Sequence, residues 1–155
     1  MQQGIVIAIF VTPESGDPMK PVDSVLAVEN RGIIGDRYYT MSGTFSKSEL
    51  EPDQEITLVE HEAFEELRSN HQVQLQYAEC RRNVITQHVD LNALVGHTFQ
   101  VGQVTLRGMR LCEPCAYLSQ MTGHRNLVKQ WLHRAGLRAH IQKGGRISKN
   151  DAVIV

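Results

Sequence analysis

Short β-rich runs, each followed by a turn signal, are the feature that most limits what this chain can fold into. The first run covers residues 5–11 and ends at a loop that contains Pro13, Gly16 and Pro18. Similar runs recur at residues 22–28, 56–59, 84–86, 98–101, 104–111 and 152–155. β-branched and apolar stretches of this length between Gly, Pro, Asn and Asp are typical of strands. Apolar residues at helical spacing predict a helix after residue 59 and a longer one after Thr122. The sequence therefore predicts a mainly β protein, a β-barrel with peripheral α-helices.

Length and charge narrow the class further. A chain of 155 residues predicts a single domain spanning residues 1–155. The net charge of −1 argues against a nucleic-acid partner, which favours a basic face. The apolar run at residues 5–11 is too short to span a bilayer, and the N-terminus lacks the pattern of a signal peptide. We therefore expect a cytoplasmic protein with no membrane partner, whose three cysteines stay reduced.

Two of the cysteines, Cys112 and Cys115, form a C-x-x-C pair directly after the run at residues 104–111. A zinc site would need a second pair with ligand spacing, and none is present. A thioredoxin-like pair would open a helix after a βαβ-type strand, whereas this pair follows a predicted hairpin. A single soft thiolate that holds a metal or carries sulfur fits the spacing too, as does a pair of buried core residues. Spacing alone leaves all four readings open.

Arg81-Arg82-Asn83 stands before another strand-like run. Paired arginines can fork onto a phosphate or another oxyanion, and an asparagine both donates and accepts hydrogen bonds. An exposed, solvated charge pair at the start of a strand explains the same residues.

A glycine-punctuated segment, residues 32–37, ends in Asp36 and Arg37. It has neither the G-x-G-x-x-G pattern nor a P-loop lysine, so it matches no nucleotide-binding fingerprint. Gly35 can supply a positive φ, and the two charged side chains can pair with each other or contact a ligand. A structured turn is the simpler interpretation.

Taken together, these motifs resemble the MOSC family, which is named after the C-terminal domain of molybdenum cofactor sulfurases. Residues 32–37 are similar to the family's G-[LI]-x-G-D-R stretch, and residues 81–86 to its R-x-N block. Residues 90–102 are similar to its D-L-x-x-L-x-G block. Residues 110–115 are similar to its cysteine segment, and residues 139–151 to its closing hairpin. The motifs occur in the family's order and at its spacing, from about residue 22 to the C-terminus. This chain is therefore similar to a small stand-alone member of the family.

The resemblance implies a MOSC-like β-barrel and a link to the molybdenum cofactor, molybdopterin. Cys115 matches the molybdenum-ligating cysteine of amidoxime-reducing members, so it is the implied metal ligand and catalytic thiol. Cys112 matches an upstream cysteine and would be a neighbour of that ligand or a resolving thiol. Cofactor-binding residues implied by the motifs are Arg81, Asn83, Arg37 and Asp36.

The implied function is binding of the cofactor, or of its sulfur, through a cysteine thiolate. As an enzyme, the protein would either reduce N-hydroxylated compounds at molybdenum or transfer sulfur to molybdenum. Two alternatives are a non-catalytic carrier of cofactor or sulfur and a metal-free thiol-disulfide protein. No pyridoxal-phosphate domain or extra N-terminal barrel is recognised in the sequence, so expected partners are a sulfur donor, a redox partner or an apo-molybdoenzyme.

Overall fold

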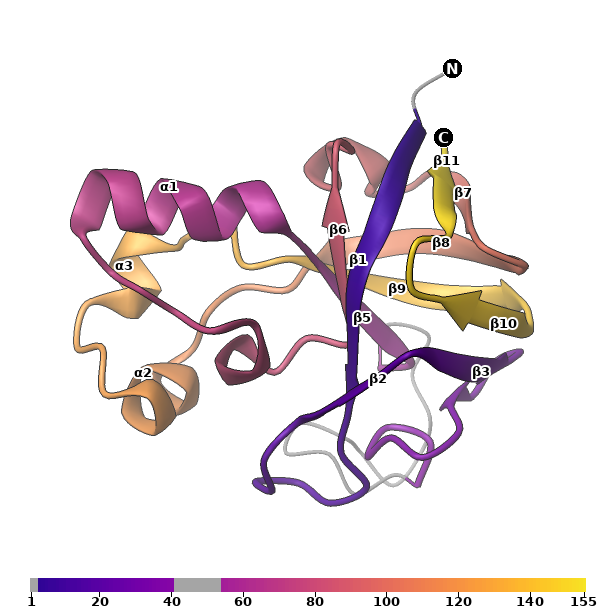
Figure 1. The fold of residues 1–155 in the computed structure, drawn as a ribbon, viewed down its shortest axis with the longest axis horizontal. Helices are drawn as coiled ribbons and strands as arrows, with labels where there is room; N and C mark the ends of the chain where they lie inside the picture. The colour runs from indigo at the N-terminus through magenta and orange to yellow at the C-terminus, as the bar shows by residue number, and fades with distance from the viewer. Residues whose placement is uncertain (1–2, 41–53) are drawn as a thin grey trace.

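The computed structural model describes residues 3–40 and 54–155 (Figure 1). Its strands are β1 (Gln3–Val11), β2 (Lys20–Val22), β3 (Ser24–Val28), β4 (Gly32–Ile33), β5 (Ile56–Glu60), β6 (Val84–Gln87), β7 (Thr98–Val101), β8 (Val104–Leu111), β9 (Leu137–Lys143), β10 (Gly145–Ser148) and β11 (Ala152–Ile154). Its helices are α1 (His61–His71), α2 (Ala116–Thr122) and α3 (Leu127–Gln130), with 3-10 turns η1 (Tyr77–Cys80) and η2 (Asn92–Leu94). None of the helices in these two ranges is long and apolar enough to cross a membrane.

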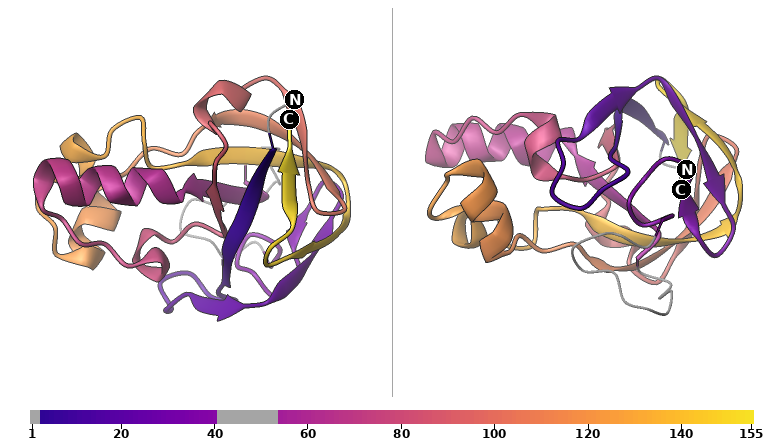
Figure 2. Two further views of the ribbon diagram at one scale, coloured as in Figure 1. Left: turned by 45° about the horizontal axis from the view of Figure 1, so that its top comes forward. Right: turned by 90° about the horizontal axis from the view of Figure 1, so that it is seen from below.

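A closed ring of strands forms the centre of the fold. Within the described ranges, seven strands pair in the order β1-β6-β5-β9-β8-β7-β11, and β11 pairs back onto β1. Closure joins the two ends of the chain, since Gln3 lies opposite Ile154 and Ile5 opposite Ala152. Only closure satisfies the edge strands of such a sheet completely. The prediction of a mainly β protein with a barrel and peripheral helices is confirmed (Figure 2).

The barrel interior is packed with apolar side chains. A second, smaller sheet, in the order β10-β3-β4, adds its own apolar residues to this core. Fully buried residues of the core include Val6, Ile33, Ile56, Leu58, Val84, Val101, Val104, Leu106, Leu137, Ala139, Ile141, Ile147 and Val153. These apolar side chains fill the interior of the described ring of strands.

The helices gather on one side of the barrel (Figure 2). There a second apolar cluster joins Phe10, Val59 and Ile85 of the strands to Phe64 of α1 and to Trp131. The Trp131 indole nitrogen donates a hydrogen bond to the Ala63 carbonyl oxygen at 3.1 Å, and its ring packs edge-on against Phe64. This cluster attaches the helical region to the outer face of the barrel.

The prediction of a single longer helix after Thr122 is wrong. The structure instead has α2 ending at Thr122 and a four-residue α3 beginning at Leu127. Gly123 adopts a left-handed conformation with φ of 76°, and its N–H bonds the Ser119 carbonyl oxygen, which closes α2. Thr122, after which the helix was predicted to begin, is therefore the last residue of α2, because a left-handed glycine ends a helix readily.

Glu55, directly before β5, is a buried acid at the edge of the barrel core. Its carboxylate accepts the Ile141 N–H at 2.8 Å and lies 2.8 Å from His140 Nδ1. Burial raises the pKa of Glu55 above its ordinary value of 4.5, and the bonds to Ile141 and His140 oppose that rise in part. A raised folded pKa gives stability that is present below the unfolded value and is lost as the pH rises through the folded value.

Glu55→Gln is expected to remove this loss. The unfolding free energy of the variant, relative to the wild type, should therefore increase between pH 4.5 and pH 7.5, because only the wild type loses the stabilising proton. Urea unfolding followed by the fluorescence of Trp131 measures both proteins across this range. A difference that stays constant with pH would contradict the prediction.

Candidate functional site

The three cysteines differ sharply in exposure. Cys80 is 0% and Cys112 is 2% exposed, whereas Cys115 is partly exposed at the start of α2. The Cys80 thiol donates to the Tyr77 carbonyl oxygen at 3.0 Å, and burial raises its pKa to about 11. The Cys112 N–H donates to the Gly136 carbonyl oxygen at 2.7 Å. Of these thiols, Cys115 is the one that a ligand in solution can reach most easily.

Arg82 anchors the cysteine segment from inside the protein, and the sequence analysis did not single it out as a site residue. Its side chain is 8% exposed. Nε donates to the Ala135 carbonyl oxygen at 2.8 Å, and Nη1 donates to that of Cys80 at 3.1 Å. Nη2 donates to the carbonyl oxygens of Cys112 at 3.0 Å and Glu113 at 3.4 Å. The residue pattern before β6 showed two arginines but not which way each side chain points.

The Arg81 side chain binds a different segment from Arg82, the loop between β1 and β2. Its backbone is left-handed, with φ of 63°, and its side chain is 7% exposed. Nη1 donates to the Asp17 carbonyl oxygen at 2.8 Å, while the buried Nη2 has no hydrogen-bond partner in the described part of the chain. Burial, and next the nearby Arg37 guanidinium, lower the pKa of Arg81. Arg81 is thus a buried cation with an unused donor.

A hollow of about 260 Å³ adjoins Arg81. The loop between β1 and β2 forms one wall, η1 a second, and the end of α2 a third. Its lining residues are Gly16, Pro18, Met19, Ala78, Glu79, Arg81, Met121 and Thr122. Cys115 therefore lies at the beginning of α2 and this hollow at the end of the same helix.

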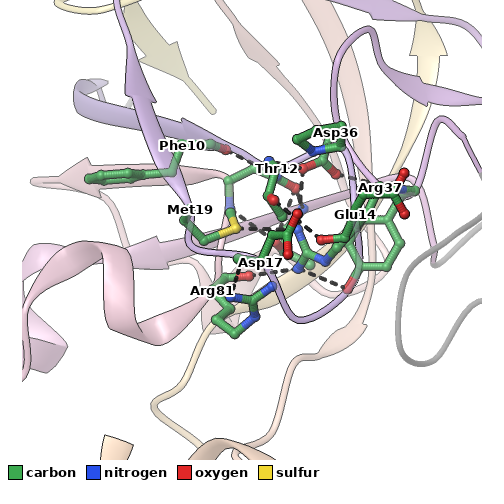
Figure 3. A network of polar contacts seen from close by, with 12 residues as sticks. Phe10, Thr12, Glu14, Asp17, Met19, Asp36, Arg37 and Arg81 are labelled. Carbon is green, nitrogen blue, oxygen red and sulfur yellow. Dashed lines mark hydrogen bonds and ion pairs between the residues drawn. The ribbon is translucent and has the colours of Figure 1, made fainter. Parts of the chain in front are cut away.

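Asp36 and Arg37 form a buried pair that holds the backbone of Arg81 (Figure 3). Arg37 Nη1 lies 3.2 Å from Asp36 Oδ1, and Nη2 donates to the Arg81 carbonyl oxygen at 2.9 Å. Asp36 Oδ1 also accepts the Thr12 N–H at 3.2 Å. The guanidinium of Arg37 lies over the Tyr38 ring, 4.4 Å from its centroid. The structure thus brings Asp36, Arg37 and Arg81 together, and direct contact of the pair with a cofactor stays a prediction.

Asn83 lies inside the sheet. Its Oδ1 accepts hydrogen bonds from the Thr57 N–H and from the Thr57 hydroxyl, both at 3.1 Å. Its Nδ2 donates to the Phe10 carbonyl oxygen at 3.2 Å. The side chain therefore joins β1, β5 and β6, and the structure does not bring it next to Cys115 through any of these bonds. A contact between Asn83 and a cofactor also stays a prediction.

Tyr117 belongs to this region, although the sequence analysis missed it. A Cβ atom at Gly16 would lie 3.5 Å from the Tyr117 hydroxyl, and Tyr117 is close enough to Arg81 to affect its pKa. Its only sequence signal is its position two residues after Cys115. Among residues 3–40 and 54–155, no group of three or more His, Cys, Asp or Glu side chains could hold a metal ion by itself.

Comparison with known proteins gives a family match and several similar structures. A family model described as MOSC domain matches residues 46–154. No curated protein matches the chain. The YuaD protein from Bacillus subtilis aligns with a TM-score of 0.83 and 15% identity over 97% of this chain and 94% of its own. YiiM from Geobacillus stearothermophilus aligns with a TM-score of 0.74 and 14% identity over 97% of this chain and 74% of its own. YiiM from Escherichia coli aligns with a TM-score of 0.69 and 15% identity over 99% of this chain and 69% of its own. At these identities the structures show a shared fold alone.

Proposed function

Because the chain belongs to the MOSC domain family, we propose that it binds the molybdenum cofactor, or a sulfur atom carried for it, through the thiolate of Cys115. The observation that carries the proposal is the exposure of the cysteines. Cys80 and Cys112 are buried, while Cys115 is partly exposed. A thiolate is a soft donor that suits molybdenum, and it can also carry sulfur as a persulfide.

The residues around Arg81 fit an anionic cofactor. Arg81 Nη2 is buried without a partner, and an unpaired charged donor is costly inside a protein. A phosphate or pterin oxygen would satisfy this donor with a charge-assisted hydrogen bond. Since Nη2 is covered, the loop that Arg81 holds at Asp17 has to move slightly to admit the ligand. Arg81 is then the direct contact.

In this proposal three further residues support Arg81 without contacting the cofactor themselves: Asp36, Arg37 and Asn83. The Arg37 guanidinium bonds the Arg81 carbonyl oxygen, and Asp36 fixes Arg37. Asn83 ties the strand that follows Arg81 to its two neighbours. Together they hold Arg81 in its left-handed conformation, which a non-glycine residue adopts at a cost.

Bound molybdenum would supply the two-electron chemistry that removes oxygen from an N-hydroxylated compound, or would itself be the acceptor of sulfur. The chain contributes a thiolate at Cys115 and a cation at Arg81. A carrier that passes its ligand to an apoenzyme would use the same two residues. The two functions differ in one measurement: a carrier binds molybdopterin without turnover when a reductant is supplied, and an enzyme turns over.

Arg81→Gln is expected to weaken cofactor binding about tenfold, the effect of losing one charge-assisted hydrogen bond. Wild type and variant would be produced in a host that makes molybdenum cofactor, and molybdenum and pterin measured per folded chain. Arg81→Lys is the matched control, because it keeps the charge without the fork. Equal loading of the wild type and Arg81→Gln, under conditions in which the wild type is only partly loaded, would exclude Arg81 as the anchor. Negligible molybdenum, pterin and labile sulfur in the wild type would overturn the proposed function.

Cys112→Ser is expected to leave molybdenum and labile-sulfur loading per folded chain close to the wild-type values. Cys112 is buried, so the added hydroxyl should lower stability by about 1–3 kcal/mol without touching the ligand. Cys112→Ala is the control, because it removes the sulfur without adding a polar group. A thiol-disulfide protein would instead need both sulfurs, so that its exchange activity would fall as far in Cys112→Ser as in Cys115→Ser.

A further inference from the structure

The guanidinium of Arg82 lies where three separate segments of the chain meet. It bonds the carbonyl oxygen of Cys80 at the end of η1, and that of Ala135 before β9. It also bonds the carbonyl oxygens of Cys112 and Glu113, in the segment that leads to Cys115. All three of its nitrogens therefore donate to backbone carbonyls.

The segment from Cys112 to Cys115 has further bonds on the same side. The Cys112 N–H donates to Gly136, in the loop that also provides the Ala135 carbonyl. The Glu113 carboxylate accepts the His133 N–H at 2.6 Å and lies 2.5 Å from His133 Nδ1. These bonds attach the segment to residues 133–136, and Arg82 links both to the end of η1.

Arg81 and Arg82 are adjacent in the chain, but their side chains bind different segments. Arg81 reaches Asp17 and lines the hollow, whereas Arg82 reaches the cysteine segment. The backbone at Arg81, the first of the two residues, is left-handed, with φ of 63°. One short stretch of chain therefore connects the proposed anion contact to the segment that carries the proposed thiol.

We infer that Arg82 is a positioning residue: by binding the carbonyl oxygens of Cys112 and Glu113, it fixes where Cys115 stands relative to Arg81. The inference rests on the proposed function for the importance of Cys115, although the positioning itself can be tested without any cofactor. A guanidinium suits this role because its planar fork donates along several directions at once. A lysine keeps the charge but cannot serve carbonyls from three segments in the same geometry.

Native-state alkylation of the purified, cofactor-free protein tests this role. Iodoacetamide labelling of each cysteine would be followed by mass spectrometry in the wild type, Arg82→Lys, Arg82→Gln and Leu94→Ala. Leu94→Ala is the matched control, since Leu94 is buried in the barrel core, in a different apolar cluster from Cys80. Urea unfolding gives the unfolding constant of each protein, and its product with the labelling rate of the unfolded protein is the rate at which Cys112 would react through global unfolding alone.

In both Arg82 variants we expect Cys112 to react at least tenfold faster than global unfolding allows, because the segment is released locally. In Leu94→Ala the alkylation rate of Cys112 should equal the rate expected from global unfolding alone. A role in stability alone cannot produce this difference between the variants. If Cys112 in the Arg82 variants also follows the unfolding constant, or if Arg82→Lys protects it as the wild type does, the inference is overturned. If Arg82→Gln does not fold, Arg82→Lys carries the same test.

The same variants separate this inference from the proposed function. If the wild type binds molybdenum or labile sulfur, Arg82→Lys should lose at least nine-tenths of that loading per folded chain, and full loading would count against positioning. If the wild type binds neither, the proposed function fails, and the alkylation rates still decide whether Arg82 holds the cysteine segment.

Discussion

Cys115→Ser is expected to abolish the binding of molybdenum and of cyanide-labile sulfur. A serine hydroxyl is a harder and far weaker donor than a thiolate, and it cannot carry a persulfide. Because Cys115 is partly exposed, the change should cost less stability than a serine at the buried Cys112. Both proteins would be purified from a host that makes molybdenum cofactor. Molybdenum, pterin and labile sulfur per chain should be near stoichiometric in the wild type and less than a tenth of that in the variant.

Two controls make this result specific. Cys112→Ala removes the other sulfur of the C-x-x-C pair and should keep the loading. The unfolding free energy of Cys115→Ser, measured in urea, shows whether the protein is still folded. Undiminished loading of Cys115→Ser would exclude this thiol as the ligand, and it would point to a site held by other groups, such as Arg81.

Asn83→Ala should lower the unfolding free energy by about 3 kcal/mol, since it leaves buried donors and acceptors without partners. The Thr57 N–H, the Thr57 hydroxyl and the Phe10 carbonyl oxygen each lose a hydrogen bond. These groups lie on strands β1 and β5, where water cannot replace the amide. Urea unfolding followed by Trp131 fluorescence measures the loss.

Asn92→Ala provides the comparison for this prediction. The partly buried Asn92 donates an exposed hydrogen bond from Nδ2 to the His133 carbonyl oxygen at 2.7 Å. It should cost about 1 kcal/mol or less. Cofactor loading per folded chain should fall only in part in Asn83→Ala, because this side chain supports Arg81 from within the sheet and does not itself contact the cofactor. Loss of loading with little loss of stability would instead make Asn83 a direct cofactor contact.

Local features of the fold could be predicted from the sequence, and distant pairings could not. The hairpin formed by residues 98–101 and 104–111 could be predicted because its two strands are adjacent in the chain, and Val101 does lie opposite Val104. Pairing of β1 with β11 joins residues from opposite ends of the chain, and no local pattern encodes such a partner. The helix after Thr122 was overextended, because apolar spacing continues to Ala135 although α3 ends at Gln130.

The candidate site shows a similar limit. Residue types identified Arg81, Asn83 and the two cysteines as candidates, but not the direction of their side chains. The Asn83 side chain bonds within the sheet, the Arg81 side chain bonds Asp17, and the backbone at Arg81 is left-handed. The sequence gives no sign of that backbone conformation, since arginine rarely adopts it. Arg82 was overlooked because the sequence does not show which segment its side chain binds.

Pairing between the first and last strands also constrains how the protein forms during synthesis. While a ribosome is still making the chain, β1 can pair with β2 and β6, but the edge that later receives β11 stays open. The outer edge of β7 is open for the same period, since its other partner is also β11. Unpaired strand edges attract other chains. Protection of these two edges from association therefore depends on β11, Ala152–Ile154, which leaves the ribosome after the other described strands and helices.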